Sequence, residues 1–140
     1  MKKLNVDYTA VAINTGGRKG HVKSDDGLLD FDVAMPKEIG GKGGKTNPEQ
    51  LLAAAYSTCF GGALASVAGK VSLRDSEITA KVHLGSFGPE DYGIAVDIFV
   101  KIPQAESLVA AQKLADAAHE ICLISKATRN NIEVNIKAVK

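Results

Sequence analysis

Hydrophobic and polar residues alternate along several stretches of the chain, and a period of two predicts β-strands. The first stretch covers residues 4 to 13, where every second side chain over Leu4–Tyr8 is apolar. The turn-forming residues 15 to 17 (Thr-Gly-Gly) come next and lead into a second strand near residues 18 to 22. Residues 29 to 33 alternate apolar side chains with aspartates. The N-terminal part of the chain therefore predicts three strands.

A long apolar segment follows a glycine-rich loop. Residues 46 to 69, TNPEQLLAAAYSTCFGGALASVAG, contain one charged side chain, Glu49, and one thiol, Cys59. Asn47-Pro48 suits the N-cap and the first helical position, and Gly69 suits a helix end. Apolar residues lie on all sides of this helix, so we expect it to be buried around its whole circumference.

The C-terminal half repeats strand and helix patterns. Residues 78–84 and 94–102 alternate around a turn that contains glycine and proline, which predicts a β-hairpin. Residues 105–121 carry apolar side chains at helical spacing, and residues 132–136 form a last strand. The order β-β-β-α-β-β-α-β groups the strands into blocks around two helices. This order predicts an α+β fold in a single domain over residues 1–140.

Composition excludes several classes of protein. The chain has 140 residues, of which 45% are hydrophobic and 24% charged, as in an ordinary globular domain. A net charge of +1 supplies no basic surplus for a phosphate backbone, and 5% aromatic residues without tryptophan offer few rings for stacking on bases. Nucleic acid is therefore not an expected partner.

Neither the N-terminus nor the long apolar segment predicts export or membrane insertion. Asn5 and Asp7 interrupt the apolar run that a signal peptide needs after Lys2 and Lys3. The run from residue 51 to residue 68 is long enough to span a membrane, but it is rich in Ala, Gly, Ser and Thr. We expect a buried helix in a cytoplasmic protein without membrane contact.

The chain has two cysteines, Cys59 and Cys122, which are too few for a secreted disulfide framework and lack neighbours at zinc-ligand spacing. Because free cysteines are usually buried, Cys59 could simply be an inert thiol in the core. A reactive thiol needs a lowered pKa, and Cys59 lies about three turns beyond Pro48, too far for the N-terminus of its own helix to supply it. A cation from elsewhere in the chain is then required.

Three further residues are candidates for chemistry with Cys59. Arg18 follows the Thr-Gly-Gly turn and stays charged even when partly buried, although most turn arginines are simply solvated. Glu49 would complement the helix dipole, or it would bind the Arg18 guanidinium through two hydrogen bonds. Cys122 would be a small core residue, or the second thiol with which a sulfenic acid condenses.

Two other patterns are weaker evidence of function. Residues 40 to 46 resemble a phosphate-binding loop but leave three residues, where the pattern needs four, before Gly-Lys-Thr, so a flexible loop is the preferred interpretation and a nucleotide-binding module the least favoured function. His21, His83 and His119 are scattered, and no chemistry is assigned to them.

Three motifs together resemble those of the organic hydroperoxide resistance proteins of the OsmC/Ohr superfamily, in the same order. They are TGGRKGH at residues 15–21, TNPEQL at residues 46–51 and CFGGAL at residues 59–64. The resemblance covers essentially the whole chain. It implies an intertwined α+β homodimer that reduces organic and fatty-acid hydroperoxides to alcohols. It implies no metal or bound organic cofactor.

The resemblance also implies roles for individual residues. Cys59 would be the peroxidatic thiol, Arg18 and Glu49 its activating pair, and Cys122 the resolving thiol. The reductant would be a dithiol, the dihydrolipoyl group of a lipoylated protein. One departure concerns the second cysteine, which the family usually follows with Pro-Tyr-Ser-Asn-Ala-Thr, whereas this chain has LISKAT at residues 123–128. Without the proline and the tyrosine, we expect a different resolving loop and slow recycling.

The helix that carries Cys59 suggests a substrate and an assembly. Tyr56 and Phe60 flank Cys59, and we expect them to form an apolar wall that favours bulky organic peroxides. Glu49 lies ten residues before Cys59, roughly 15 Å along the helix axis. Two antiparallel copies of the helix would bring Glu49 of one chain near Cys59 of the other, so we expect a homodimer with shared sites. The alternatives are a peroxidase of the osmotically inducible OsmC branch and a non-catalytic redox-sensing or binding protein.

Overall fold

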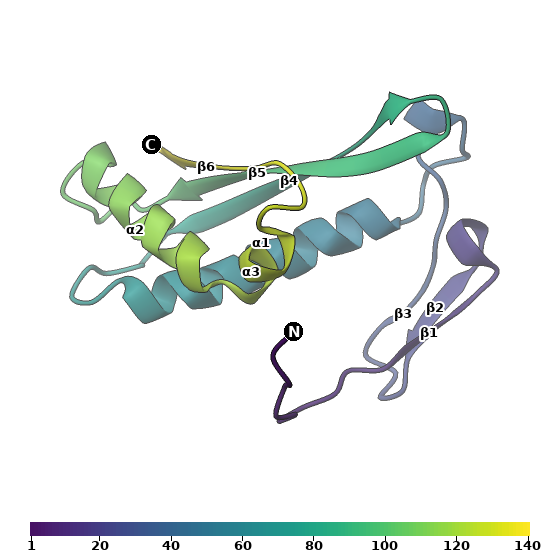
Figure 1. Cartoon of the computed structure of the whole chain (residues 1–140), viewed down its shortest axis with the longest axis horizontal. Coiled ribbons are helices and arrows are strands. Elements are labelled where there is room, and N and C mark those ends of the chain that lie inside the picture. Colours follow the sequence, from purple (N-terminus) through teal and green to yellow (C-terminus); the bar gives the residue numbers. More distant parts are fainter. The chain divides into compact units, whose positions relative to one another are not determined.

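The structure, a computed structural model, describes residues 1–140 and divides into two compact units, Met1–Pro48 and Glu49–Lys140 (Figure 1). The N-terminal unit contains an antiparallel three-stranded sheet in the order β1-β2-β3. Its strands are β1 (Ala12–Thr15), β2 (His21–Ser24) and β3 (Asp30–Asp32). Two short 3₁₀ helices, η1 (Gly17–Lys19) and η2 (Lys37–Ile39), lie in its connections.

The turn before Arg18 has a defined conformation. Gly16 and Gly17 both have positive φ angles, 85° and 62°, which glycine adopts without steric cost. The Asn14 side chain accepts a hydrogen bond from the Gly17 N–H at 2.9 Å and donates one to the Gly17 carbonyl at 3.1 Å. These contacts fix η1, in which Arg18 is the central residue.

The strand predicted over residues 4 to 13 is shorter in the structure. Only Ala12–Thr15 pairs with a neighbouring strand, and Leu4, Val6 and Tyr8 are 78%, 68% and 80% exposed. An alternating segment becomes a strand only where another strand accepts and donates its backbone hydrogen bonds. Residues 4 to 10 have no such neighbour within this chain.

The C-terminal unit contains a second three-stranded sheet and three helices. Strands β4 (Glu77–Gly88) and β5 (Asp91–Lys101) form the expected antiparallel hairpin, and β6 (Val134–Val139) pairs with β5 in parallel. The helices are α1 (Pro48–Val67), α2 (Leu108–Ile121) and α3 (Leu123–Thr128). The Ser107 hydroxyl caps α2 by accepting from the Ala110 N–H at 3.0 Å. The short helix α3 has no counterpart in the sequence prediction.

The core of this unit lies between the sheet and the helices. The inward side chains of β5, Val96, Ile98 and Val100, are completely buried. Side chains of α1 and α2 pack against them, so both helices cover the same face of the sheet. The α+β class and the order of the principal elements predicted from the sequence are confirmed.

Burial of α1 differs from the expectation of a helix covered on all sides. Its buried residues, Tyr56, Phe60, Ala63 and Leu64, follow a spacing of three and four and so share one face. The opposite face, which includes Ala55, is exposed. With a mean hydropathy of 1.2 in its most apolar window, α1 is long and apolar enough to cross a membrane. Core helices of soluble proteins can have the same length and hydropathy. Complete burial of the two aromatic rings against the sheet favours a packing role.

Candidate active site

The two cysteines of the chain lie side by side in the C-terminal unit. Cys59 is in the middle of α1, and Cys122 lies between α2 and α3. Their Sγ atoms are 3.5 Å apart, and both are free thiols. A disulfide requires about 2.0 Å, so a movement of roughly 1.5 Å would join them. Cys59 is partly exposed, whereas Cys122 is 1% exposed.

Cys122 occupies a sharp bend of the backbone. Its N–H donates to the Ala118 carbonyl at 2.9 Å and closes α2, while its own carbonyl accepts from the Lys126 N–H at 2.9 Å and opens α3. Its φ and ψ of −59° and 128° are not helical and turn the chain between the two helices. Hydrogen bonds on both sides therefore hold the second thiol in place.

The surroundings of Cys59 favour its thiolate. Partial burial raises the pKa of the Cys59 thiol, but three hydrogen bonds to the sulfur lower it, and the net pKa lies below its ordinary value. The donors are the backbone N–H of Ile124, the Cys122 thiol and the backbone N–H of Leu123. The first N–H groups of a helix have no partner within the helix, which leaves those of α3 available to the sulfur. This stabilisation has no signal in the sequence, because the six residues of α3 are too few to show a helical period.

Leu123 allows a direct test of the backbone contribution. Leu123→Pro removes one N–H donor, whereas Leu123→Ala keeps it. The side chain is 71% exposed, and proline suits a first helical position that follows an extended residue, so both variants should fold. We expect the proline variant to have a higher Cys59 pKa and to react with iodoacetamide about threefold to tenfold more slowly below that pKa. An equal effect of both variants, or none, would contradict the assignment.

Tyr56 and Phe60 do not lie where the sequence analysis placed them. Both rings are 0% exposed, so neither offers surface to a bound molecule, and the expected apolar wall is not formed by them. They point into the core because i and i+4 positions of α1 face the sheet. The Tyr56 hydroxyl instead forms a 2.8 Å hydrogen bond with the Ser125 hydroxyl.

His119 is a residue that the sequence analysis passed over. Its Nδ1 lies 2.8 Å from the Ser125 hydroxyl, and Ser125 is completely buried. Burial lowers the pKa of His119, the nearby charge of Arg129 lowers it further, and Glu120 and Asp116 oppose the shift; the net pKa lies below its ordinary value. The only sequence signal was spacing, since His119, Cys122 and Ser125 are three residues apart.

The other two predicted site residues lie on different elements. Arg18 is in η1 of the N-terminal unit, and Glu49 is in the first turn of α1. Their pairing with each other and with Cys59 stays a prediction. No group of three or more His, Cys, Asp or Glu side chains is placed to hold a metal ion.

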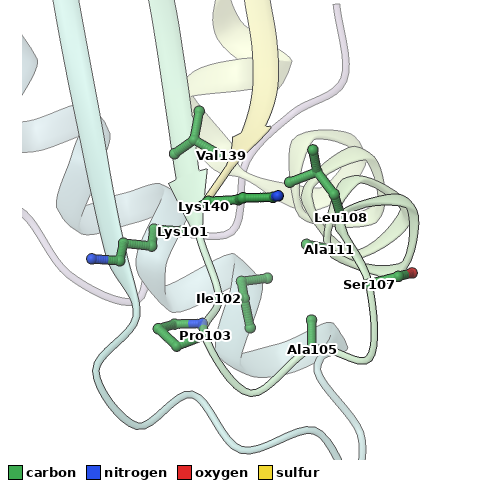
Figure 2. A pocket seen from close by; sticks show the side chains of 9 residues that line it. All are labelled: Lys101, Ile102, Pro103, Ala105, Ser107, Leu108, Ala111, Val139 and Lys140. Carbon is green, nitrogen blue, oxygen red and sulfur yellow. The ribbon is translucent and has the colours of Figure 1, made fainter.

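A separate cavity of about 270 Å³ lies at the other end of α2 (Figure 2). Its lining is mostly apolar and includes Ile102, Ala105 and Leu108, with Lys101 and Lys140 among the remaining residues. The 14 residues of α2 extend about 20 Å, so the start of this helix is far from Cys122 at its end. This cavity is not part of the cysteine site.

Comparison with known proteins identifies the family. Residues 41–137 match the family model described as OsmC-like protein. The chain is 46% identical to organic hydroperoxide resistance protein OhrB of Bacillus subtilis, with 93% of this chain and 96% of the relative covered. It is also similar to two crystal structures of proteins described as organic hydroperoxide resistance proteins.

The first, from Legionella pneumophila, has a TM-score of 0.90 and 40% identity, covering 97% of this chain and 100% of that one. The second, described as putative and from Vibrio cholerae, holds a molecule of captopril in one of its active sites. It has a TM-score of 0.88 and 36% identity, covering 98% of this chain and 95% of that one. The chain is therefore a member of the OsmC-like family and belongs with its organic hydroperoxide resistance proteins.

Proposed function

We propose that this chain is a cysteine-based peroxidase that reduces organic hydroperoxides to alcohols. The observation that carries the proposal is the pair of free thiols 3.5 Å apart, one partly exposed with a lowered pKa and one buried. A thiolate is the nucleophilic form of cysteine, and a second thiol within reach is what a sulfenic acid needs to form a disulfide. The names of the relatives support organic hydroperoxides as the substrates.

The reaction would proceed in two steps on these thiols. The Cys59 thiolate attacks the distal peroxide oxygen, the O–O bond breaks, and the alkoxide leaves and takes up a proton to become the alcohol. Cys59 is then a sulfenic acid. The Cys122 sulfur attacks it, the S–S bond forms, and the hydroxyl group leaves with the Cys122 proton as water.

Recycling needs two electrons from outside the chain. We propose a dithiol, such as the dihydrolipoyl group of a lipoylated protein, because a dithiol reduces a disulfide by thiol exchange and closes its own ring. Captopril is a thiol, and its presence in an active site of the Vibrio relative supports access of a small thiol to such a site. A recycled thiol enzyme suits a reducing compartment, so we propose a cytoplasmic location, which cell fractionation would check.

Arg18 and Glu49 are proposed as the pair that supports the thiolate together with the backbone of α3. The fixed Asn14–Gly17 turn presents Arg18 on a short 3₁₀ helix, and an arginine can bind a carboxylate and still donate to a second acceptor. Removing a cation near sulfur raises the thiol pKa. An Arg18→Ala chain with an unchanged Cys59 pKa would exclude Arg18 from this role.

We also propose that two chains form a homodimer through α1. The exposed face of α1 carries small uncharged side chains, among them Ala54, Ala55 and Gly62, which allow a second helix to approach closely. The segment 4–8, whose apolar side chains are exposed, could also pair as a strand with the second chain. A protein that sediments with the mass of a single chain at micromolar concentration would contradict this proposal.

The proposed activity is tested by turnover. With dihydrolipoamide as reductant, we expect kcat/KM for cumene or fatty-acid hydroperoxides to exceed that for hydrogen peroxide by about 10-fold or more, since each buried methylene contributes about 0.8 kcal/mol. Cys59 lies among apolar core side chains, which suits an organic tail. Equal efficiencies would contradict the substrate assignment. A single oxidation without turnover would instead indicate a redox sensor.

A further inference from the structure

Three side chains form a buried polar chain beside the two cysteines. The Ser125 hydroxyl lies 2.8 Å from the Tyr56 hydroxyl and 2.8 Å from His119 Nδ1. Tyr56 and Ser125 are both 0% exposed, and His119 is half-buried. These residues come from α1, α3 and α2 respectively, so one serine hydroxyl joins the three helices of the unit.

The positions of these residues relate directly to the thiols. Tyr56 lies one helical turn before Cys59, while His119 and Ser125 lie three residues before and after Cys122. The His119–Ser125 hydrogen bond therefore spans the bend that carries Cys122. The Ser125–Tyr56 hydrogen bond ties that bend to the turn of α1 next to Cys59.

The number of hydrogens that these three hydrogen-bonded side chains can share favours a neutral His119. Ser125 has one hydroxyl hydrogen, so it can donate to only one of its two partners. When Nδ1 is unprotonated, Tyr56 donates to Ser125 and Ser125 donates to His119, and all three groups are satisfied. A protonated Nδ1 would donate to Ser125, and either the Ser125 hydrogen or the Tyr56 hydrogen would then need a different acceptor. The lowered pKa of His119, set by burial and Arg129 against Glu120 and Asp116, agrees with the neutral form.

We infer that Ser125, held between Tyr56 and His119, is a positioning residue for the resolving thiol. The inference rests on the proposed peroxidase function and concerns only its second step. Cys122 must close from 3.5 Å to bonding distance before its sulfur displaces water from the Cys59 sulfenic acid. Backbone bonds at the bend set the position of Cys122 along its own chain, and the Tyr56–Ser125 bond sets it relative to α1. Loss of that bond slows disulfide formation and leaves the attack on peroxide unchanged.

The test separates the two steps in single-turnover experiments. Reduced protein is mixed with one equivalent of cumene hydroperoxide, and samples are quenched over time. Peroxide loss measures the first step, and intact mass with and without dimedone measures the sulfenic acid and the disulfide. Ser125→Ala removes the bridging hydroxyl. Tyr56→Phe removes only the link to α1 and keeps the ring that fills the core, so it tests the inference even where Ser125→Ala does not fold.

We expect both variants to consume peroxide within about twofold of the parent rate. The sulfenic acid should persist about 10-fold longer or more, because a misplacement of a reacting group by about 1 Å slows a reaction by at least this factor. Ser76→Ala is the matched control, since it removes a serine hydroxyl bonded to the Leu73 carbonyl of a loop; it should match the parent in both steps. His119→Asn, whose amide can replace Nδ1 as a partner of Ser125, should resolve faster than His119→Ala.

Two results would overturn the inference while leaving the peroxidase proposal intact. One is disulfide formation at the parent rate in Tyr56→Phe. The other is an equal loss of both steps, which would show a general disturbance of the site. A parent protein that consumes no peroxide would overturn the proposed function itself, and the inference with it.

Discussion

Replacing Cys59 with serine is expected to lower kcat/KM for organic hydroperoxides by at least about 10³-fold. Serine has nearly the same shape and can still contact Cys122, but its hydroxyl does not ionise near neutral pH. The lowered pKa of Cys59 shows that its environment favours an anion, which serine cannot supply. Peroxide loss in the presence of dihydrolipoamide measures the effect.

Circular dichroism and reaction of the remaining Cys122 thiol after unfolding would show that the serine variant is otherwise intact. A folded Cys59→Ser protein that keeps more than about a tenth of the parent activity would exclude Cys59 as the nucleophile. Because Cys122 is 1% exposed, it could not take over the reaction without a rearrangement of the bend between α2 and α3.

Replacing Cys122 with serine should separate the first turnover from the rest. We expect this variant to consume about one equivalent of peroxide and then to lose most of its steady-state rate, about 10-fold or more, because Cys59 sulfenic acid has no neighbouring thiol with which to condense. With excess peroxide, Cys59 should proceed to sulfinic acid, which mass spectrometry detects as two oxygens added to the thiol.

Steady turnover of the Cys122→Ser protein at the parent rate would show that Cys122 is a packing residue. Serine keeps a hydrogen-bond donor near the Cys59 sulfur, so a change in the first step is not expected to mask the result. Comparison with Ser125→Ala is informative, because that variant keeps the Cys122 thiol but loses the hydrogen bonds that position it.

Strong local patterns predicted the principal elements of this fold. The alternation over residues 78–84 and 94–102 corresponds to β4 and β5, and the Asn47-Pro48 signal marks the start of α1. These features depend on neighbouring residues in the sequence, which a periodic pattern records. The pairing of β6 with β5, in contrast, is parallel and joins distant segments, and no local pattern specifies it.

The cysteine site shows where sequence patterns were insufficient. Cys59 and Cys122 were expected to react with each other only through the family resemblance, because their 3.5 Å separation depends on how α1, α2 and α3 pack. Helix α3 is six residues long and begins after a cysteine, which is not a favoured capping residue. A pattern too short to show periodicity therefore hid the backbone donors to Cys59, and with them the role of Ser125.

Substitution of the usual Pro-Tyr by Leu123 and Ile124 has a physical consequence that the sequence analysis did not foresee. A leucine has a backbone N–H where proline has none, and this N–H is one of the groups that lower the Cys59 pKa. The departure that predicted slow recycling thus also favours the reactive thiolate in the first step.

A stoichiometric reaction would show whether Cys59 and Cys122 together reduce an organic hydroperoxide. Reduced protein receives one equivalent of cumene hydroperoxide, and products are measured by chromatography, intact mass and peptide mapping under non-reducing conditions. We expect one cumyl alcohol per chain, loss of two hydrogens from the protein, and a peptide that joins Cys59 to Cys122. Both thiols remaining free after exposure to the peroxide, with no alcohol formed, would contradict it.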